Sequence, residues 1–382
     1  MKSFGLWYKK KEGEVIPRNT PCLESTKVEQ QNNTNIPVHE PRISLHVNLW
    51  FLGDIQANNN KGSFLDIGFK IENYSQIEKL TFHCPFRLER ENIEDLSEKL
   101  NTKENANIIF NKDCEIETKD SYTIVNISKK AGQPEEPLLI FPLDQAISEI
   151  FILQNLDNIN KTNLVFDFTK FIQYVEKVER LKSINDIYIR FRIQNIDLKD
   201  KIYFDSEPLN KSFESAFSGT RIIDFKINET RNIDELIRAK ILIENEVWVK
   251  MNKVHFLVME PSSYDLTSFS DDKMTCRELE ERMWDNYLGR QIDFSKGHAL
   301  AYHWKQEESK STSFSCLVKV KYSKARWHTI VAYSIMVIVL GIISSTIVSI
   351  FFESFPKECR VPSLLIIVLI LLLVAGLLNK KK

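Results

Sequence analysis

The chain has 382 residues, with 51 Lys and Arg against 52 Asp and Glu and a formal net charge of −1. It has only 11 glycines, and neither G-x-x-x-x-G-K-[ST] nor G-x-G-x-x-G occurs. Such loops need glycine because the backbone must approach a phosphate closely, so the sequence argues against P-loop NTPases, Rossmann dehydrogenases and protein kinases. The six cysteines form no C-x-x-C pair, and we interpret them as free thiols.

The near-neutral net charge conceals two parts of opposite sign. Residues 319–382 contain nine of the Lys and Arg and only two Glu, a formal charge of +7. Residues 1–318 contain the other 42 basic residues and 50 acidic ones, a formal charge of −8. The sequence therefore predicts an acidic body followed by a basic tail.

The first 41 residues are predicted to be weakly ordered. Residues 30–35 are polar and low in complexity, and the prolines at positions 17, 21, 37 and 41 interrupt any periodicity. Met1–Lys11 lacks a continuous apolar stretch, so we expect no secretory signal there.

Period-2 alternation of apolar and polar residues then predicts a β-rich body over residues 42–323. Three closely spaced runs, residues 43–51, 65–71 and 80–86, predict an antiparallel meander with one buried face. Further strands are predicted at residues 108–110, 122–127, 138–141, 164–168, 187–193, 223–227, 254–259, 299–304 and 313–322. Helices are predicted at residues 92–100, 143–151, 169–181, 233–243 and, after a capping box at Thr275 and Glu278, 275–288. We expect an α+β, β-rich fold with antiparallel sheets in a sandwich, and two subdomains that meet near residues 142–162.

The C-terminal residues 324–382 predict a transmembrane hairpin with a basic tail. Residues 330–352 carry no charge, and residues 361–378 are likewise apolar, so each segment is long enough to cross a bilayer. Seven Lys and Arg flank the ends that face the body and the C-terminus, against two in the short loop. The positive-inside rule then places the body and the C-terminus on the cytoplasmic side of the cell (inner) membrane, with two spans.

Two groups of residues in this region are candidate membrane contacts. Small side chains at Gly341, Ser344 and Ser345 predict close helix packing, either within one chain or between chains in an oligomer. A juxtamembrane cluster is predicted to contact anionic lipid headgroups and to set the topology. It consists of Lys319, Lys321, Lys324 and Arg326.

One strand of the body carries a candidate binding face. Tyr188, Arg190 and Arg192 alternate with apolar residues, so the three share one face of a strand whose other face is buried. Arg pairs with phosphate and an aromatic ring can stack on a base, so we predict a site for an anion or a nucleotide. The alternative is a solvated or partner-covered sheet face with cross-strand ion pairs. No catalytic group, metal site or cofactor motif can be assigned.

In layout the chain is similar to bacterial membrane effectors of antiviral defence, in which a cytosolic sensor controls a transmembrane hairpin. We therefore expect a sensor or effector whose body controls a hairpin that oligomerises and perturbs the membrane. The alternatives are a static membrane anchor or scaffold for a cytoplasmic partner, and a membrane-bound enzyme. The expected partners are the lipid bilayer, further copies of the chain, and a small nucleotide or protein activator. The acidic body argues against extended nucleic acid.

Overall fold

A computed structural model describes residues 2–11, 40–52, 62–119, 122–128, 136–143, 150–206, 218–268, 274–280, 282–289, 298–307, 312–323, 327–354 and 356. The chain divides into two compact units. The first comprises residues 1–207 and 219–322, and the second comprises residues 208–218 and 323–382. The predicted helix at residues 143–151 falls largely outside the described residues.

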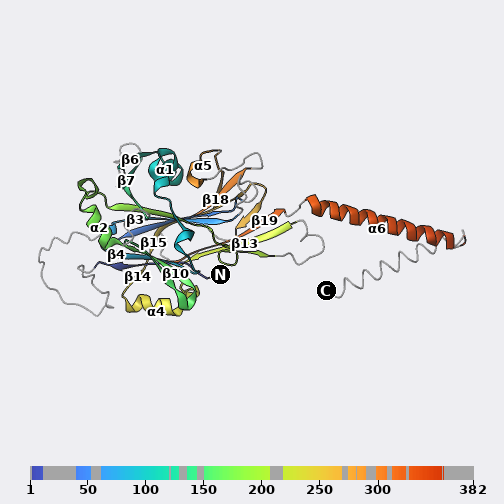
Figure 1. The fold of residues 1–382 in the computed structure, drawn as a ribbon, viewed down its shortest axis with the longest axis horizontal. Coiled ribbons are helices and arrows are strands. Elements are labelled where there is room, and N and C mark those ends of the chain that lie inside the picture. The colour runs from blue at the N-terminus through green and yellow to red at the C-terminus, as the bar shows by residue number, and fades with distance from the viewer. Residues whose placement is uncertain are drawn as a thin grey trace, which may run out of the picture. The chain divides into compact units, whose positions relative to one another are not determined.

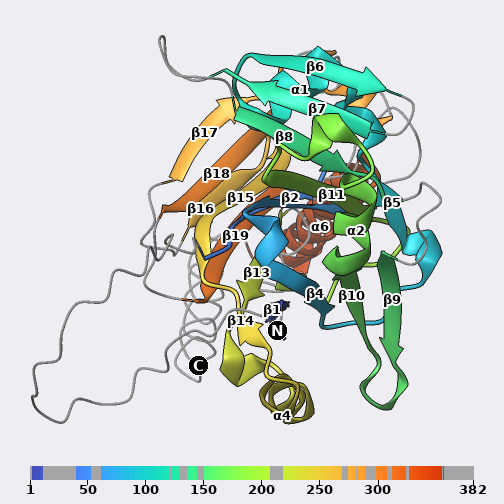
Figure 2. The same ribbon diagram turned by 90° about the vertical axis from the view of Figure 1, so that its left-hand side faces the viewer.

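A ten-stranded mixed sheet is the largest element of the first unit (Figure 2). Its order is β17 (Met274–Glu278), β18 (Ala299–Glu307), β15 (Met251–Pro261), β2 (Arg42–Trp50), β3 (Phe64–Glu72), β11 (Asp186–Ile193), β8 (Glu136–Phe141), β7 (Tyr122–Ile127) and β6 (Cys114–Lys119), with β5 (Ile93–Asp95) also paired to β11. β15 pairs with β2, and β11 with β8, in parallel. Strands from both sides of residues 142–162 therefore share this sheet.

The other strands of the described residues form two smaller sheets. One has the order β14 (Val247–Trp248), β1 (Gly5–Lys10), β4 (Ile77–Cys84), β10 (Lys161–Asp167) and β9 (Phe151–Leu156), and it is antiparallel. The other has the order β12 (Tyr203–Ser206), β13 (Ser218–Ile227), β19 (Phe314–Ser323) and β16 (Asp265–Ser268).

Several helices of the first unit lie outside the ten-stranded and five-stranded sheets (Figure 1). The α-helices are α1 (Lys103–Phe110), α2 (Phe168–Val175), α4 (Glu235–Ile243), α5 (Asp285–Leu288) and α6 (Trp327–Ser354). Short 3₁₀ turns lie at η2 (Tyr74–Gln76), η3 (Arg90–Asn92), η4 (Glu98–Asn101), η5 (Asp157–Ile159), η6 (Glu179–Leu181) and η7 (Thr230–Asn232). In the first unit, α1 and α5 lie outside the ten-stranded sheet, whereas α4 lies outside the five-stranded sheet.

The core lies between the ten-stranded and five-stranded sheets. Alternate residues of each strand point inward, and aromatic side chains from both sheets meet there. Phe69 of β3 and Phe191 of β11 both lie against Phe82 of β4, with ring centroids 5.6 and 6.0 Å apart. The predicted β-rich class with packed sheets is confirmed, although the largest sheet is mixed rather than purely antiparallel.

Local alternation predicted most strands to within a few residues, but not all of the elements. Residues 5–10, expected to be weakly ordered, form the buried strand β1, because Leu6 and Tyr8 enter the core and Trp7 packs under α4. The three-strand meander is wrong, since β2 pairs with β3 whereas β4 pairs with β1 and β10 in the other sheet.

In three further segments, the structure differs from the element that the local sequence pattern predicted. The expected helix at residues 92–100 is wrong, because Ile93 pairs with Ile193 in β5 and β11. The expected strand at 108–110 is the end of α1. The apparent capping box at Thr275 and Glu278 belongs to β17, whose backbone pairs with β18.

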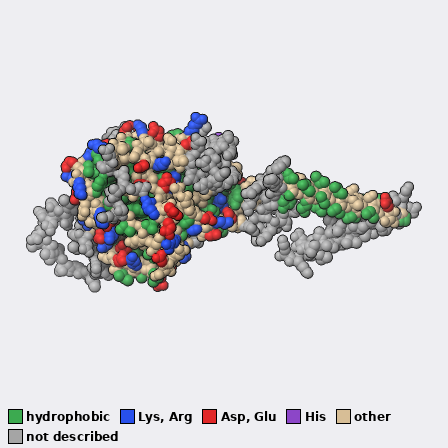
Figure 3. Space-filling model, in the orientation of Figure 1, with side chains coloured by type: hydrophobic (Ala, Val, Ile, Leu, Met, Phe, Trp, Pro, Cys, Tyr) green, Lys and Arg blue, Asp and Glu red, His purple; other side chains and the backbone are tan. Residues whose placement is uncertain are grey.

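The second unit contains the long apolar helix α6. Within the 25 residues Ile330–Ser354, a window of 18 residues has a mean hydropathy of 2.6, and none of that window is buried in the protein. At about 1.5 Å per residue, the 25-residue stretch exceeds the ~30 Å hydrocarbon thickness of a bilayer. Hydrophobic side chains make up much of its visible surface (Figure 3). α6 is thus one candidate membrane span, while the second predicted span at residues 361–378 lies outside the described residues.

Candidate functional site

The inner face of the ten-stranded sheet is apolar, whereas its outer face carries a band of polar side chains. Strand register aligns one row across five strands. From β11 to β18 this row is Arg190, Gly68, His46, His255 and Lys305. Because side chains of paired residues point to the same face of a sheet, these groups are neighbours although they come from distant parts of the sequence.

A cavity of about 660 Å³ lies over this face. β2, β3, β11, β15, β17 and β18 form its base, and the end of α1 and Trp284 contribute walls. Its basic lining residues are Lys70, Lys112, Arg190, Lys253, Arg277 and Lys305, whereas its acidic ones are Glu72 and Glu136. The cavity therefore carries a local excess of positive charge within an acidic body. We refer to it as the basic pocket.

Arg190 lies beneath the basic pocket with its guanidinium group buried against neutral partners. Its Nε donates to the Tyr287 hydroxyl at 2.6 Å and its Nη1 donates to the Tyr188 hydroxyl at 2.8 Å. With the Asn48 amide oriented to suit its neighbours, the Asn48 oxygen accepts from Nη2 at 2.8 Å. Burial raises the pKa of both tyrosines, so they stay neutral. The hydrogen-bond partners of Arg190 are therefore neutral, and the carboxylate of Asp66, which pairs with Arg192, lies 4.0 Å from Arg190 Nη2.

Arg192 has a different role, because Asp66 neutralises it. Its Nε and Nη2 donate to the two Asp66 carboxylate oxygens at 2.7 and 3.3 Å, with both side chains fully buried. Trp50 Nε1 and the Tyr287 hydroxyl also donate to Asp66, at 3.0 and 2.8 Å. A buried charge pair satisfied in this way resists disruption, since removing one partner would leave the other charge buried and unpaired.

Gly68 permits the contact between the buried network and the pocket. A Cβ atom at this position would lie 2.4 Å from the Tyr188 hydroxyl oxygen and 3.1 Å from Arg190 Nη1. In the absence of a side chain, the Tyr188 hydroxyl reaches His46 Nδ1 at 3.0 Å. This hydroxyl accepts from Arg190 and keeps one proton, which it can donate to His46 when Nδ1 is unprotonated.

Three histidines form a contiguous group in the basic pocket. His255 Nδ1 and His303 Nε2 are 3.0 Å apart, and their rings stack with centroids 5.2 Å apart and an interplanar angle of 12°. The His46 ring lies edge-on to His255 at 5.0 Å. Burial is the largest cause that lowers the pKa of each, and nearby cations add to it; the pKa of His255 falls to about 4.

Three carboxylates converge at one side of the basic pocket. The oxygens of Glu72, Glu136 and Asp186 approach one another closely enough to hold a cation. Lys70 already supplies one, since its ammonium group pairs with Glu136 and lies 3.4 Å from Glu72. Burial raises the pKa of Asp186 to about 6. We therefore interpret this group as the counter-charge of Lys70 rather than as a metal site.

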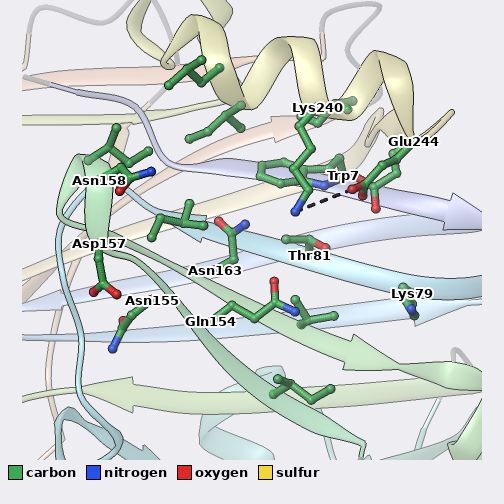
Figure 4. A pocket seen from close by; sticks show the side chains of 18 residues that line it. Trp7, Lys79, Thr81, Gln154, Asn155, Asp157, Asn158, Asn163, Lys240 and Glu244 are labelled. Carbon is green, nitrogen blue, oxygen red and sulfur yellow. Dashed lines mark ion pairs between the residues drawn. The ribbon is translucent and has the colours of Figure 1, made fainter.

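A second cavity, of about 620 Å³, lies between α4 and the five-stranded sheet (Figure 4). Apolar side chains of α4 face Thr81, Gln154 and Asn163 across it. Lys240 and Glu244 pair at 3.7 Å on its rim. Its few charges are of both signs, so this cavity provides no ligand chemistry as distinct as that of the basic pocket.

The residues predicted from sequence fall into three places. Arg190 lines the basic pocket, and Tyr188 lies behind the lining, where its hydroxyl contacts His46. Arg192 is held by Asp66 and does not line the pocket. Gly341, Ser344 and Ser345 are exposed on α6, and a Cβ at Gly341 would meet nothing within 4 Å. Lys319 and Lys321 are exposed on β19, while Lys324 and Arg326 lie outside the described residues.

Sequence reasoning missed the histidines and Gly68. His46 and His255 become neighbours only through the parallel pairing of β2 with β15, which no local pattern indicates. The available signal was that each occupies a polar position of an alternating strand. The same signal marked Tyr188 and Arg190, whose shared face is confirmed by the register.

Comparisons with known proteins leave the chain without a family. No family model matches the chain, and no curated protein matches it. Among solved structures, the chain has a weak similarity to the Fcho1 Mu homology domain of Danio rerio with a bound Eps15 peptide. The identity is 6% over 74% of this chain and 78% of that one, with a TM-score of 0.15. A similarity at this level carries no argument about fold or function.

Proposed function

We propose that this chain is a membrane-anchored sensor whose basic pocket binds a small anionic ligand. The observation that supports this proposal is the composition of the pocket, with six Lys and Arg against two Glu in a body that is acidic as a whole. A cavity of several hundred Å³ with a few converging polar groups is the usual form of a small-molecule site. Clustered cations raise the local concentration of anions there.

The flanking rings favour an anion that carries a planar group. Phe110 and Trp284 line the pocket together with the histidines. Aromatic and imidazole faces stack on planar bases, while Lys and Arg pair with phosphate. A nucleotide or another phosphorylated ring compound combines both features, so we propose this class of ligand.

The proposal that the chain is anchored in a membrane rests on α6 and on the basic residues around the apolar segments. We propose that residues 324–382 form a two-span hairpin in the cell (inner) membrane, with the body on the Lys-rich, cytoplasmic side. The candidate span in α6 and the nine Lys and Arg of residues 319–382 support it. Oligomerisation, membrane perturbation and a role in antiviral defence remain predictions from the sequence.

Ligand binding by the full-length chain tests the proposal that the basic pocket binds an anion. Isothermal titration in detergent at low salt, with ATP, cyclic di-AMP and sulfate as probes, should detect binding of at least one. Replacing Lys253, Arg277 and Lys305 by Gln should weaken it by roughly 30-fold, about 2 kcal/mol, because three favourable charges are removed.

A matched control separates the pocket from overall charge. Arg87, Lys182 and Lys199 lie outside the pocket, and their exposure of 45–49% resembles the 42–43% of Arg277 and Lys305. Their replacement by Gln should leave the affinity within about twofold. If no probe binds, or if both triple variants weaken binding equally, the basic pocket is not the anion site.

A further inference from the structure

The His255 and His303 pair is placed so that it can accept one proton without losing its contact. In the neutral pair, one ring nitrogen donates and the other accepts across the 3.0 Å separation. One added proton preserves this bond, because an imidazolium can still donate to a neutral imidazole and the bond becomes charge-assisted. A second added proton would leave no acceptor, so the pair can hold only one extra proton while it keeps this hydrogen bond.

The neighbouring charges oppose that proton as long as the pocket is empty. The cations that face the histidines are Lys70 of β3, Arg190 of β11, Lys253 of β15, Arg277 of β17 and Lys305 of β18, with Lys112 after α1. The other titratable groups there are His46, Glu72, Glu136, Glu307, Tyr188 and Cys276.

Most of these acids are already paired with cations. Glu72 and Glu136 contact Lys70, and Glu307 pairs with Lys305. Burial and the remaining positive charges lower the pKa of His255 to about 4 and also lower that of His303. The pair is therefore neutral in the unliganded protein near neutral pH.

We propose that an anion entering the basic pocket binds together with one proton, which the His255–His303 pair takes up. This inference rests on the proposed function, because it deepens the role of the same pocket. A bound anion replaces the repulsion of the cations by attraction, so it favours the protonated pair. The pocket thereby becomes an acid-enhanced anion site.

The sign of the pH dependence follows from linkage. Between the pKa of the pair in the free protein and its higher value in the complex, only the complex holds the extra proton. Affinity must then increase as pH falls through this interval, by up to tenfold per pH unit for one proton. Below the pKa of the pair in the free protein, both the free and the bound protein hold the proton, so affinity no longer depends on pH.

Isothermal titration of the full-length chain in detergent measures this proton directly. The probes are cyclic di-AMP and sulfate, neither of which changes charge in the range used. At about pH 6.5, the binding enthalpy in buffers of different ionisation enthalpy should show uptake of close to one proton per anion. Affinity should be at least about fivefold higher at about pH 6 than at about pH 8.

The double variant His255→Asn, His303→Gln identifies the proton acceptor. One amide can place its nitrogen and the other its oxygen near the two ring nitrogens that meet, so a donor still faces an acceptor, but neither group titrates. We expect proton uptake to fall to near zero, and the affinity that the double variant retains to be equal within about twofold at about pH 6 and about pH 8. His298→Asn is the control, since His298 is exposed and does not line the pocket, and it should leave proton uptake unchanged.

The outcomes separate the two proposals. Binding without proton uptake and with equal affinity at both pH values overturns the inference and leaves anion sensing intact. Uptake that persists in the double variant assigns the proton to another group and also overturns it. Absence of binding by both probes at either pH overturns the inference and weakens the proposed function together with it.

Discussion

Gly68 and Tyr188 show how much of the pocket depends on single residues. The Tyr188 side chain is fully buried, and its hydroxyl connects Arg190 to His46 across the space that Gly68 leaves open. Sequence alternation predicted that Tyr188 and Arg190 share a face. It could not predict that this face is covered, because burial here depends on α1 and α5, which pack over it.

Gly68→Ala should disrupt this connection. The added Cβ would lie 2.4 Å from the Tyr188 hydroxyl oxygen, and the buried ring has little room to move. We expect a loss of about 1–3 kcal/mol in the free energy of unfolding, measured by urea unfolding of the detergent-solubilised chain. Gly341→Ala, which lies in the separate unit that contains α6, should not lower the free energy of unfolding of the body. Equal stability of Gly68→Ala and the wild type would contradict this account.

The helix α6 is the element whose role follows most directly from its own residues. Most of its hydrophobic side chains from Ile330 to Ile350 are exposed, a pattern that is costly in water and favourable in lipid. The strands of the body differ in this respect. Their alternation predicted that they exist, but their partners are set by pairing between residues as far apart as Leu6 and Val249 or His46 and His255.

Charges placed in the two predicted spans test the hairpin. A central Asp costs roughly 2.5–3.5 kcal/mol of insertion free energy, so Ile342→Asp or Leu371→Asp alone should leave the chain anchored by the other span. The double variant should be released by alkaline carbonate extraction of membranes. Complete release by Ile342→Asp alone would show that α6 is the sole anchor.

At the scale of the whole molecule, charge and hydropathy together predict an orientation. The basic residues of 319–382 lie mostly at the ends of the apolar segments that adjoin the body and the C-terminus. Positive charges on these flanks resist translocation, which favours a cytoplasmic body beside an anionic inner leaflet. This placement would give the basic pocket access to cytoplasmic anions.

Native cysteines provide a test of that orientation. Cys276 is exposed on the body, and Cys359 lies in the loop between the two predicted spans. In single-cysteine variants, a membrane-impermeant maleimide should label Cys359 in intact spheroplasts and Cys276 only after permeabilisation. The reverse pattern would place the body outside the cell membrane and refute the proposed topology.

Properties that depend only on neighbouring residues could be predicted from the sequence. These are the β-rich class, the alternation of strands such as β2 and β11, the apolar span in α6, and the separation of acidic body from basic tail. Each is local, because strand faces repeat every two residues and a span is one continuous helix.

The tertiary structure decided which polar faces meet. Parallel pairing of β2 with β15 placed His46 beside His255, and antiparallel pairing with β18 added His303 and Lys305. Such pairings join residues far apart in the chain, and their free energy comes from the whole core rather than from any segment. The basic pocket therefore exists only in the folded sheet, although every residue that forms it was visible in the sequence.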